Sequence, residues 1–152
     1  MFLVYDSHVE RVKKIRSLID FDIVIAVIVA AVYFEWTVRR AILALGASPT
    51  KYIRENYLKG ATFKQYPQIW NKEVYPRLNK RIGDVLSNFA FGDNPAFTLR
   101  NRIVHGELGS VKFDFGKEKV EEILTAIEEL NNFAITQYEP LSGRRIVRKK
   151  AR

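Results

Sequence analysis

Residues 99–106 (LRNRIVHG) hold the side chains best suited to chemistry in this chain. They place Arg100 five residues before His105, with Asn101 directly after the arginine. A histidine side chain exchanges protons near neutral pH, and the planar guanidinium of an arginine binds two phosphate oxygens at once. In a chain of this composition, chance gives the Arg-x4-His pair about 0.2 times, and about 0.01 times when Asn must follow the Arg. These residue types therefore suit acid–base chemistry on a phosphate group.

The segment RNRIVHG resembles the signature of the HEPN superfamily, small helical domains with an Arg-x4–6-His motif that often has Asn, Asp or His after the Arg. The predicted layout is similar too: a long apolar helix that carries an acid, a short helix with the motif, and a final amphipathic helix. Family members are commonly metal-independent endoribonucleases that dimerise around two facing motifs. The resemblance implies that Arg100 and His105 are catalytic, with support from Asn101, Arg102 and Glu35.

The resemblance also implies partners for the chain. These are RNA, a second copy of the chain, and a protein antitoxin or inhibitor, because many similar proteins act as toxins or in antiviral defence. RNA carries its own nucleophile, the 2′-OH, so an enzyme has only to move two protons and stabilise the charged phosphate. We therefore expect no metal and no cofactor, and products with a 2′,3′-cyclic phosphate and a 5′-hydroxyl.

Helix geometry leaves the roles of two motif residues open. At 100° per residue, Arg100 lies on the apolar side of its helix, about 140° from His105. A buried guanidinium needs a partner, and Glu35 is the first acid after twelve uncharged residues. Arg100 is thus either a catalytic residue or half of a structural ion pair. His105, directly before Gly106, is either an acid–base catalyst or a cation favoured by the dipole at a helix C-terminus.

The composition excludes several other kinds of site. The chain has no cysteine and two histidines, so thiolate sites and cysteine nucleophiles are impossible and a histidine-rich zinc site is not expected. It has neither a glycine-rich phosphate loop nor an HExxH motif. The absence of cysteine and of a signal-peptide pattern predicts a cytoplasmic protein. The longest uncharged run, residues 23–34, is too short to span a bilayer, so we expect no integral membrane segment.

The positive charge is concentrated at the C-terminus. The 152 residues contain 25 Lys and Arg against 17 Asp and Glu, a net charge of +8. Residues 144–152 hold six of the cations and no acid, which leaves about +2 for the rest. This tail is a candidate RNA-binding segment; alternatively it contacts an anionic membrane surface or is a solvated end without a partner. The candidate RNA-binding residues are Arg144, Arg145, Arg148, Lys149 and Lys150.

Hydrophobic periodicity predicts an all-α fold, an antiparallel bundle of about five helices with short connections. We expect one HEPN-like domain over residues 1–140 and a basic tail over 141–152. Gly46 is expected in the left-handed conformation that ends a helix, and residues 107–115 form a loop or a short β-ribbon. The expected helices cover residues 7–19, 22–46, 48–58, 76–89, 95–105 and 117–138.

Two further features have competing interpretations. A set of aromatic residues is interleaved with lysines and arginines, and such rings either stack on bases or, more often, form core or dimer interface. His8 lies near a helix start outside any motif, and we expect it at the surface. The aromatic residues are Tyr52, Tyr57, Phe63, Tyr66, Trp70 and Tyr75. A non-catalytic module that dimerises or binds RNA, and a protein at a membrane surface, remain the alternatives to a ribonuclease.

Overall fold

The computed structural model describes residues 6–137 and 141, and every regular element among them is helical. The predicted all-α class is confirmed. Five of the eight α-helices have eight or more residues: α1 (His8–Phe21), α2 (Ile23–Leu45), α4 (Tyr66–Glu73), α7 (Pro95–Val104) and α8 (Phe113–Thr136). The short elements are α3 (Thr50–Ile53), its π-helical continuation η1 (Arg54–Leu58), the 3₁₀ turn η2 (Phe63–Gln65), α5 (Tyr75–Leu78) and α6 (Ile82–Val85).

Polar caps fix where the first two helices begin. Ser7 and Glu10 form a capping box at the start of α1, in which each side chain bonds the other's backbone N–H. Asp22 lies between α1 and α2, and its carboxylate accepts from the N–H groups of Val24 and Ile25. Because these caps satisfy the free N–H groups of the first turn, both helices begin within a residue of the predicted positions.

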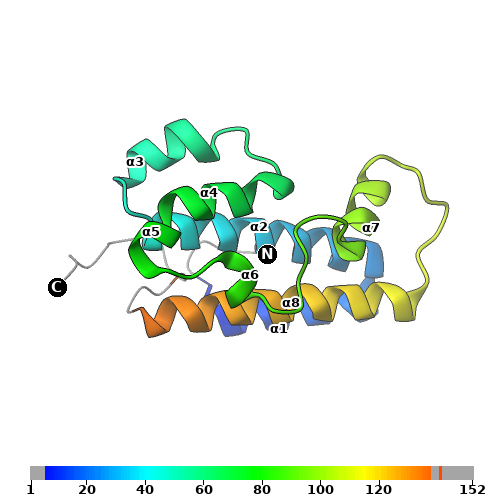
Figure 1. The fold of residues 1–152 in the computed structure, drawn as a ribbon. Helices are drawn as coiled ribbons and strands as arrows, with labels where there is room; N and C mark the ends of the chain where they lie inside the picture. The colour runs from blue at the N-terminus through cyan, green and yellow to red at the C-terminus, as the bar shows by residue number, and fades with distance from the viewer. Residues whose placement is uncertain (1–5, 138–140, 142–152) are drawn as a thin grey trace.

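Helix α2 lies at the centre of the fold (Figure 1). Helices α1 and α8 pack on one side of it, and α3, α4 and α5 lie on the other. The expected antiparallel arrangement holds for α1 against both long neighbours, whereas α2 and α8 run parallel: Ile23 lies beside Gly116, and the Arg40 side chain donates to the carbonyl of Leu141 at 2.6 Å. A short connection forces antiparallel neighbours, but the chain between α2 and α8 is long enough to return to the same end.

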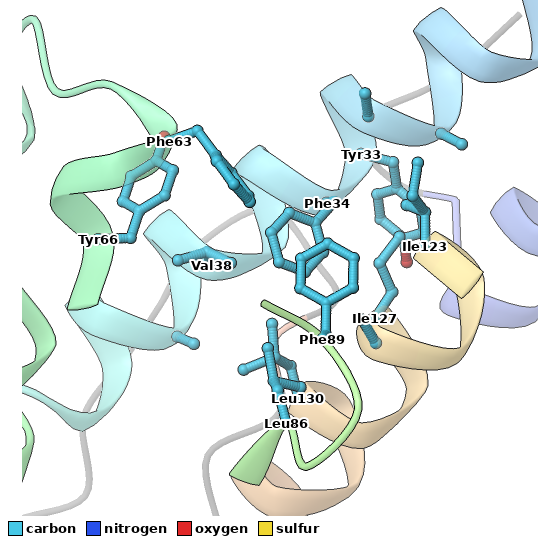
Figure 2. Packing of buried hydrophobic residues seen from close by; sticks show 14 of the residues in the cluster. Tyr33, Phe34, Val38, Phe63, Tyr66, Leu86, Phe89, Ile123, Ile127 and Leu130 are labelled. Atoms are coloured by element: carbon cyan, nitrogen blue, oxygen red, sulfur yellow. The ribbon is translucent and has the colours of Figure 1, made fainter. Parts of the chain in front are cut away.

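The core is centred on the apolar face of α2. Phe34 is fully buried, and its ring lies 4.6 Å from that of Phe89, centroid to centroid (Figure 2). Phe63 stacks on Phe97 at 3.8 Å, and both rings lie within 6.1 Å of Phe34. These contacts join α2, η2, the loop before α7, and α7 itself. The aromatic cluster therefore holds the motif-bearing helix against α2.

Two of the expected local structures differ from the observed ones. Gly46 is extended (φ −67°, ψ 158°), so a left-handed helix end was the wrong prediction. A Cβ atom there would lie 2.7 Å from both the Ile42 carbonyl and the Ile53 side chain, so the position needs glycine for close packing and not for its backbone freedom. Within the described residues, the stretch 107–115 contains no strand, and α8 already begins at Phe113.

The predicted helix over residues 76–89 is interrupted. Helix α5 ends at Asn79, which adopts φ +52°, and α6 covers only Ile82–Val85. Ile82, Leu86 and Phe89 are nevertheless buried. These apolar side chains therefore pack into the core although no continuous helix connects them.

Leu141 lies just after the predicted domain boundary at residue 140. Leu141, assigned to the tail, is buried and accepts the bond from Arg40, so the body extends at least to this residue. Pro140, Gly143 and the basic residues 144–152 lie outside the described residues. No helix among residues 6–137 is long and apolar enough to cross a membrane.

Candidate functional site

Helix α7 is fixed at its start by a cap and a proline. The Asn94 side chain accepts from the N–H groups of Ala96 and Phe97, and its own amide donates to the Ala90 carbonyl at 2.8 Å. Pro95 follows at the first helical position, as predicted. Buried Phe97 then anchors the helix in the aromatic cluster. The motif residues begin one turn later, so their directions are set by this anchor.

Arg100 and Glu35 form the ion pair that the sequence suggested. A guanidinium nitrogen of Arg100 lies 3.3 Å from the Glu35 carboxylate, and the two side chains are 23% and 27% exposed. The guanidinium also lies 5.4 Å from the centre of the Phe97 ring. Its Nε atom is buried and has no hydrogen-bond partner within the described residues. Glu35 thus holds Arg100 in place while leaving part of its bonding capacity unused.

The pair lines an open pocket of about 420 Å³. Asn101 also lines the pocket. So do Thr62 and Lys64 at the η2 turn, which precede Asn101 in the chain by more than thirty residues. Two cations, one carboxylate and neutral hydrogen-bonding groups suit an anion with a hydrogen-bonding edge, such as a nucleotide. The sequence pattern missed Thr62 as a site residue and gave Lys64 only as one of the cations among the aromatic residues, because only folding brings η2 to α7. The complete lining is Glu35, Ala61, Thr62, Phe63, Lys64, Gly92, Phe97, Arg100 and Asn101.

His105 lies outside this pocket. It is the residue that ends α7, and its N–H donates to the Asn101 carbonyl at 2.9 Å. Its side chain is exposed, and the next residue, Gly106, adopts the left-handed conformation that commonly ends a helix (φ +68°). Arg102 is also exposed, with Nε 4.0 Å from Glu107. One copy of the chain therefore brings together Arg100, Asn101 and Glu35, but not His105 or Arg102.

Comparison of the chain with protein-family models, with curated proteins and with solved structures found no match. The HEPN resemblance thus rests on the motif and the order of the helices. Among residues 6–137 and 141, no group of three or more His, Asp or Glu side chains is arranged to hold a metal ion. The five basic residues predicted to bind RNA in the tail lie outside the described residues.

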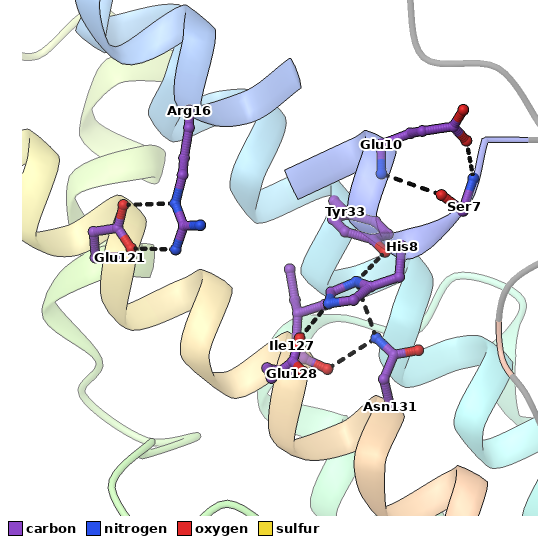
Figure 3. A network of polar contacts seen from close by, with 9 residues as sticks. All are labelled: Ser7, His8, Glu10, Arg16, Tyr33, Glu121, Ile127, Glu128 and Asn131. Atoms are coloured by element: carbon purple, nitrogen blue, oxygen red, sulfur yellow. Dashed lines mark hydrogen bonds and ion pairs between the residues drawn. The ribbon is translucent and has the colours of Figure 1, made fainter. Parts of the chain in front are cut away.

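His8 is not the surface residue that we expected (Figure 3). It is half-buried: Nδ1 lies 2.8 Å from the Tyr33 hydroxyl, and Nε2 bonds to the Glu128 carboxylate. A carboxylate only accepts, so Nε2 donates to Glu128; the Asn131 amide nitrogen 3.4 Å from Nδ1 only donates, so Nδ1 is the acceptor for this amide and for the phenol. Burial raises the pKa of the Tyr33 phenol to about 12, which keeps that donor protonated. Because His8 begins α1, this network ties the start of the chain to α2 and α8.

The aromatic set divides between core and surface. Phe63, Tyr66 and Trp70 are buried, which confirms the core interpretation for these three. The Trp70 N–H donates to the Lys80 carbonyl at 2.8 Å, and the Tyr66 hydroxyl accepts from Arg39 at 2.8 Å. The remaining three tyrosines are half-buried or exposed.

Proposed function

We propose that this protein is a metal-independent endoribonuclease whose site is built on α7. The observation that supports this proposal most directly is that Arg100 lies in an open pocket, held by Glu35 and accompanied by Asn101 and Lys64. The Arg100 side chain is 23% exposed, so a guanidinium that Glu35 holds in the pocket is preorganised to receive a phosphate oxygen on its exposed edge. The same short helix presents an exposed histidine at its end.

The proposed reaction needs two proton transfers and one charged clamp. A base removes the proton of the RNA 2′-OH as its oxygen attacks phosphorus, and an acid protonates the 5′-oxygen as the P–O5′ bond breaks. His105 serves as the acid–base group, and Arg100 stabilises the charge that builds on the phosphate oxygens. The products carry a 2′,3′-cyclic phosphate and a 5′-hydroxyl, and no outside reactant is consumed.

The proposed site is completed by a second copy of the chain. On α2, Ile25, Ile28, Val32 and Glu35 follow one another at steps of three and four residues and share one face. Val32 is 59% exposed and Ile25 40% exposed, so this face carries apolar side chains to solvent and ends at the Arg100 pair. A two-fold contact over the stripe sets two motifs beside each other and supplies the histidine that one pocket lacks.

The dimer is tested by substituting the centre of this stripe. We expect the parent chain to sediment as a dimer at micromolar concentration and Val32→Glu to sediment as a monomer, because each copy would bury an unpaired charge. Val9→Glu is the matched control, since Val9 is an exposed valine on α1 away from the stripe. A parent chain that is monomeric throughout this range argues against a shared site.

The activity is tested with single-stranded RNA in the presence of EDTA. We expect cleavage that EDTA does not reduce, with 2′,3′-cyclic phosphate ends identified by mass spectrometry. Arg100→Ala should lower the rate by about 10²-fold or more, the usual loss for a donor to a charged transition state. Products with a 3′-hydroxyl, or cleavage that EDTA abolishes, would rule out the proposed reaction.

A stable dimer that binds RNA without cutting it would instead favour the non-catalytic module. The ion pair between Arg100 and Glu35 supports this alternative, because an arginine that only neutralises a neighbouring carboxylate has a structural role and not a catalytic one. A toxin or antiviral role, with a protein inhibitor, stays a prediction from the resemblance. So does a cytoplasmic location.

A further inference from the structure

The charges of the folded body are segregated between its two sides. Residues 39–102, which include α3 to α6 and the motif, contain twelve Lys and Arg against four Asp and Glu. Helix α8 shows the opposite balance, with six Asp and Glu against two Lys. Helices α1 and α8 together carry six Lys and Arg against eight Asp and Glu, and α3 and α4 lie on the far side of α2 from α8 (Figure 1), so the α3–α4 side is the cationic side of the body.

Each side of the body has both paired and unpaired cations. On the α1–α8 side, Arg16 donates two hydrogen bonds to Glu121, whereas the exposed Lys13 and Lys117 have no ion pair within the described residues. On the α3–α4 side, the exposed Lys59, Lys64 and Lys72 also have no ion pair within the described residues, so their ammonium groups can bind a polyanion. What distinguishes this second set is the aromatic rings beside it.

Two tyrosines lie among these unpaired lysines. The Tyr52 side chain is 46% exposed, and its ring meets that of Tyr57 edge-on at 5.8 Å. The Lys72 ammonium lies 5.4 Å from the centre of the Tyr57 ring, which joins α4 to η1. Exposed rings beside cations suit single-stranded nucleic acid, because bases stack on the rings while the phosphates contact the cations.

The same surface leads into the pocket. From Tyr57 at the end of η1 the chain passes through Lys59 to residues 61–64, which line the pocket opposite Arg100. Lys64 therefore belongs both to the unpaired lysines and to the proposed site. We propose that single-stranded RNA binds along Tyr52, Tyr57, Lys59, Lys72 and Lys64, and that this tyrosine–lysine surface delivers one phosphate to Arg100. The identity of the strand as RNA rests on the proposed function; its place on the protein rests on the charges and rings.

The test measures binding to a fluorescent 2′-O-methyl RNA, which lacks the nucleophile and cannot be cleaved by the proposed reaction. Lys59→Glu/Lys72→Glu in the full chain should weaken binding at least about tenfold. It should lower the slope of log Kd against log salt by about 1.4, since each phosphate contact on a single strand contributes about 0.7. Lys13→Glu/Lys117→Glu is the matched control: both lysines are exposed on the α1–α8 side, and the net charge changes equally. Equal weakening by the control variant would overturn the proposal.

A second pair of variants isolates stacking from charge. Tyr52→Ala should weaken binding about tenfold, and Tyr52→Phe should bind like the parent, because a base stacks on the ring and not on the hydroxyl. Phosphatidylserine vesicles serve as the competing anionic partner. If the lysine variant loses vesicle binding while its affinity for RNA stays unchanged, the surface contacts membranes and the proposal fails.

The outcomes separate this inference from the proposed enzyme. If the lysine variant loses RNA binding while the parent chain never cleaves RNA, the surface stands and the ribonuclease proposal falls. If the parent cleaves RNA, and the lysine variant binds and cleaves equally well at RNA concentrations below saturation, the ribonuclease proposal stands and the proposed binding surface is wrong.

Discussion

Substitution of His105 by alanine is expected to lower the rate of RNA cleavage by about 10²- to 10⁴-fold, the usual contribution of a positioned acid–base group. The side chain is exposed at the end of α7, and its ring makes no hydrogen bond within the described residues, so its loss should leave the fold intact. Cleavage rates at saturating RNA measure the effect, and circular dichroism confirms the fold. Undiminished cleavage by His105→Ala would remove the histidine from the mechanism.

The second histidine provides the matched control. His8→Ala removes the bonds to Tyr33 and Glu128, so the buried Tyr33 phenol loses one hydrogen-bond partner. This variant should lose about 1–3 kcal/mol of unfolding free energy and keep its cleavage rate below the melting temperature. The two histidines are thus expected to show opposite effects, one on the rate and one on stability. Equal loss of cleavage in both variants would point to general disruption instead of catalysis.

Substitution of Phe34 by alanine is expected to be the most destabilising single change. The residue is fully buried at the centre of four other phenylalanine rings, and removal of a buried Phe typically costs about 3–5 kcal/mol. In a protein of this size the melting temperature should fall by about 10 °C or more. Urea denaturation followed by circular dichroism measures the free energy. The cleavage rate should fall together with the stability. Phe34 packs against α7, the helix that carries the motif, and Phe34 is also the residue directly before Glu35.

Phe21→Ala is the control for this change of residue type. Phe21 is 79% exposed at the end of α1, so its truncation should change the unfolding free energy by less than about 0.5 kcal/mol. If both variants unfold at the same urea concentration, the aromatic cluster does not carry the stability that its burial indicates.

The sequence predicted the long elements because each has a strong local signal. The apolar repeat of α8, the proline after Asn94 and the cap at Asp22 all act within a few residues of themselves. Gly46 shows the limit of such reasoning. A glycine after a long helix suggests a left-handed end, yet Gly46 is extended, and part of the crowding that excludes a Cβ there comes from Ile53, which approaches only when α3 folds back on α2.

The candidate site was also only partly predictable from the sequence. The motif and Glu35 were visible as residue types, and their pairing followed from the cost of burying a lone guanidinium. The position of η2 opposite α7 was not visible, since the aromatic contact between Phe63 and Phe97 joins segments more than thirty residues apart. The burial of His8 was not predictable either, because its partner Glu128 lies 120 residues away in the chain.

By itself, the sequence determined the helical class, the starts of α1, α2 and α7 and the chemistry available to the motif, because periodicity, caps and residue types act locally. The tertiary structure alone decided that Arg100 lies in a pocket with Lys64 while His105 lies outside it, and that the cationic helices α3 and α4 lie on the far side of α2 from the acidic helix α8. These arrangements depend on which helices pack on α2, and that choice is made by contacts between distant segments.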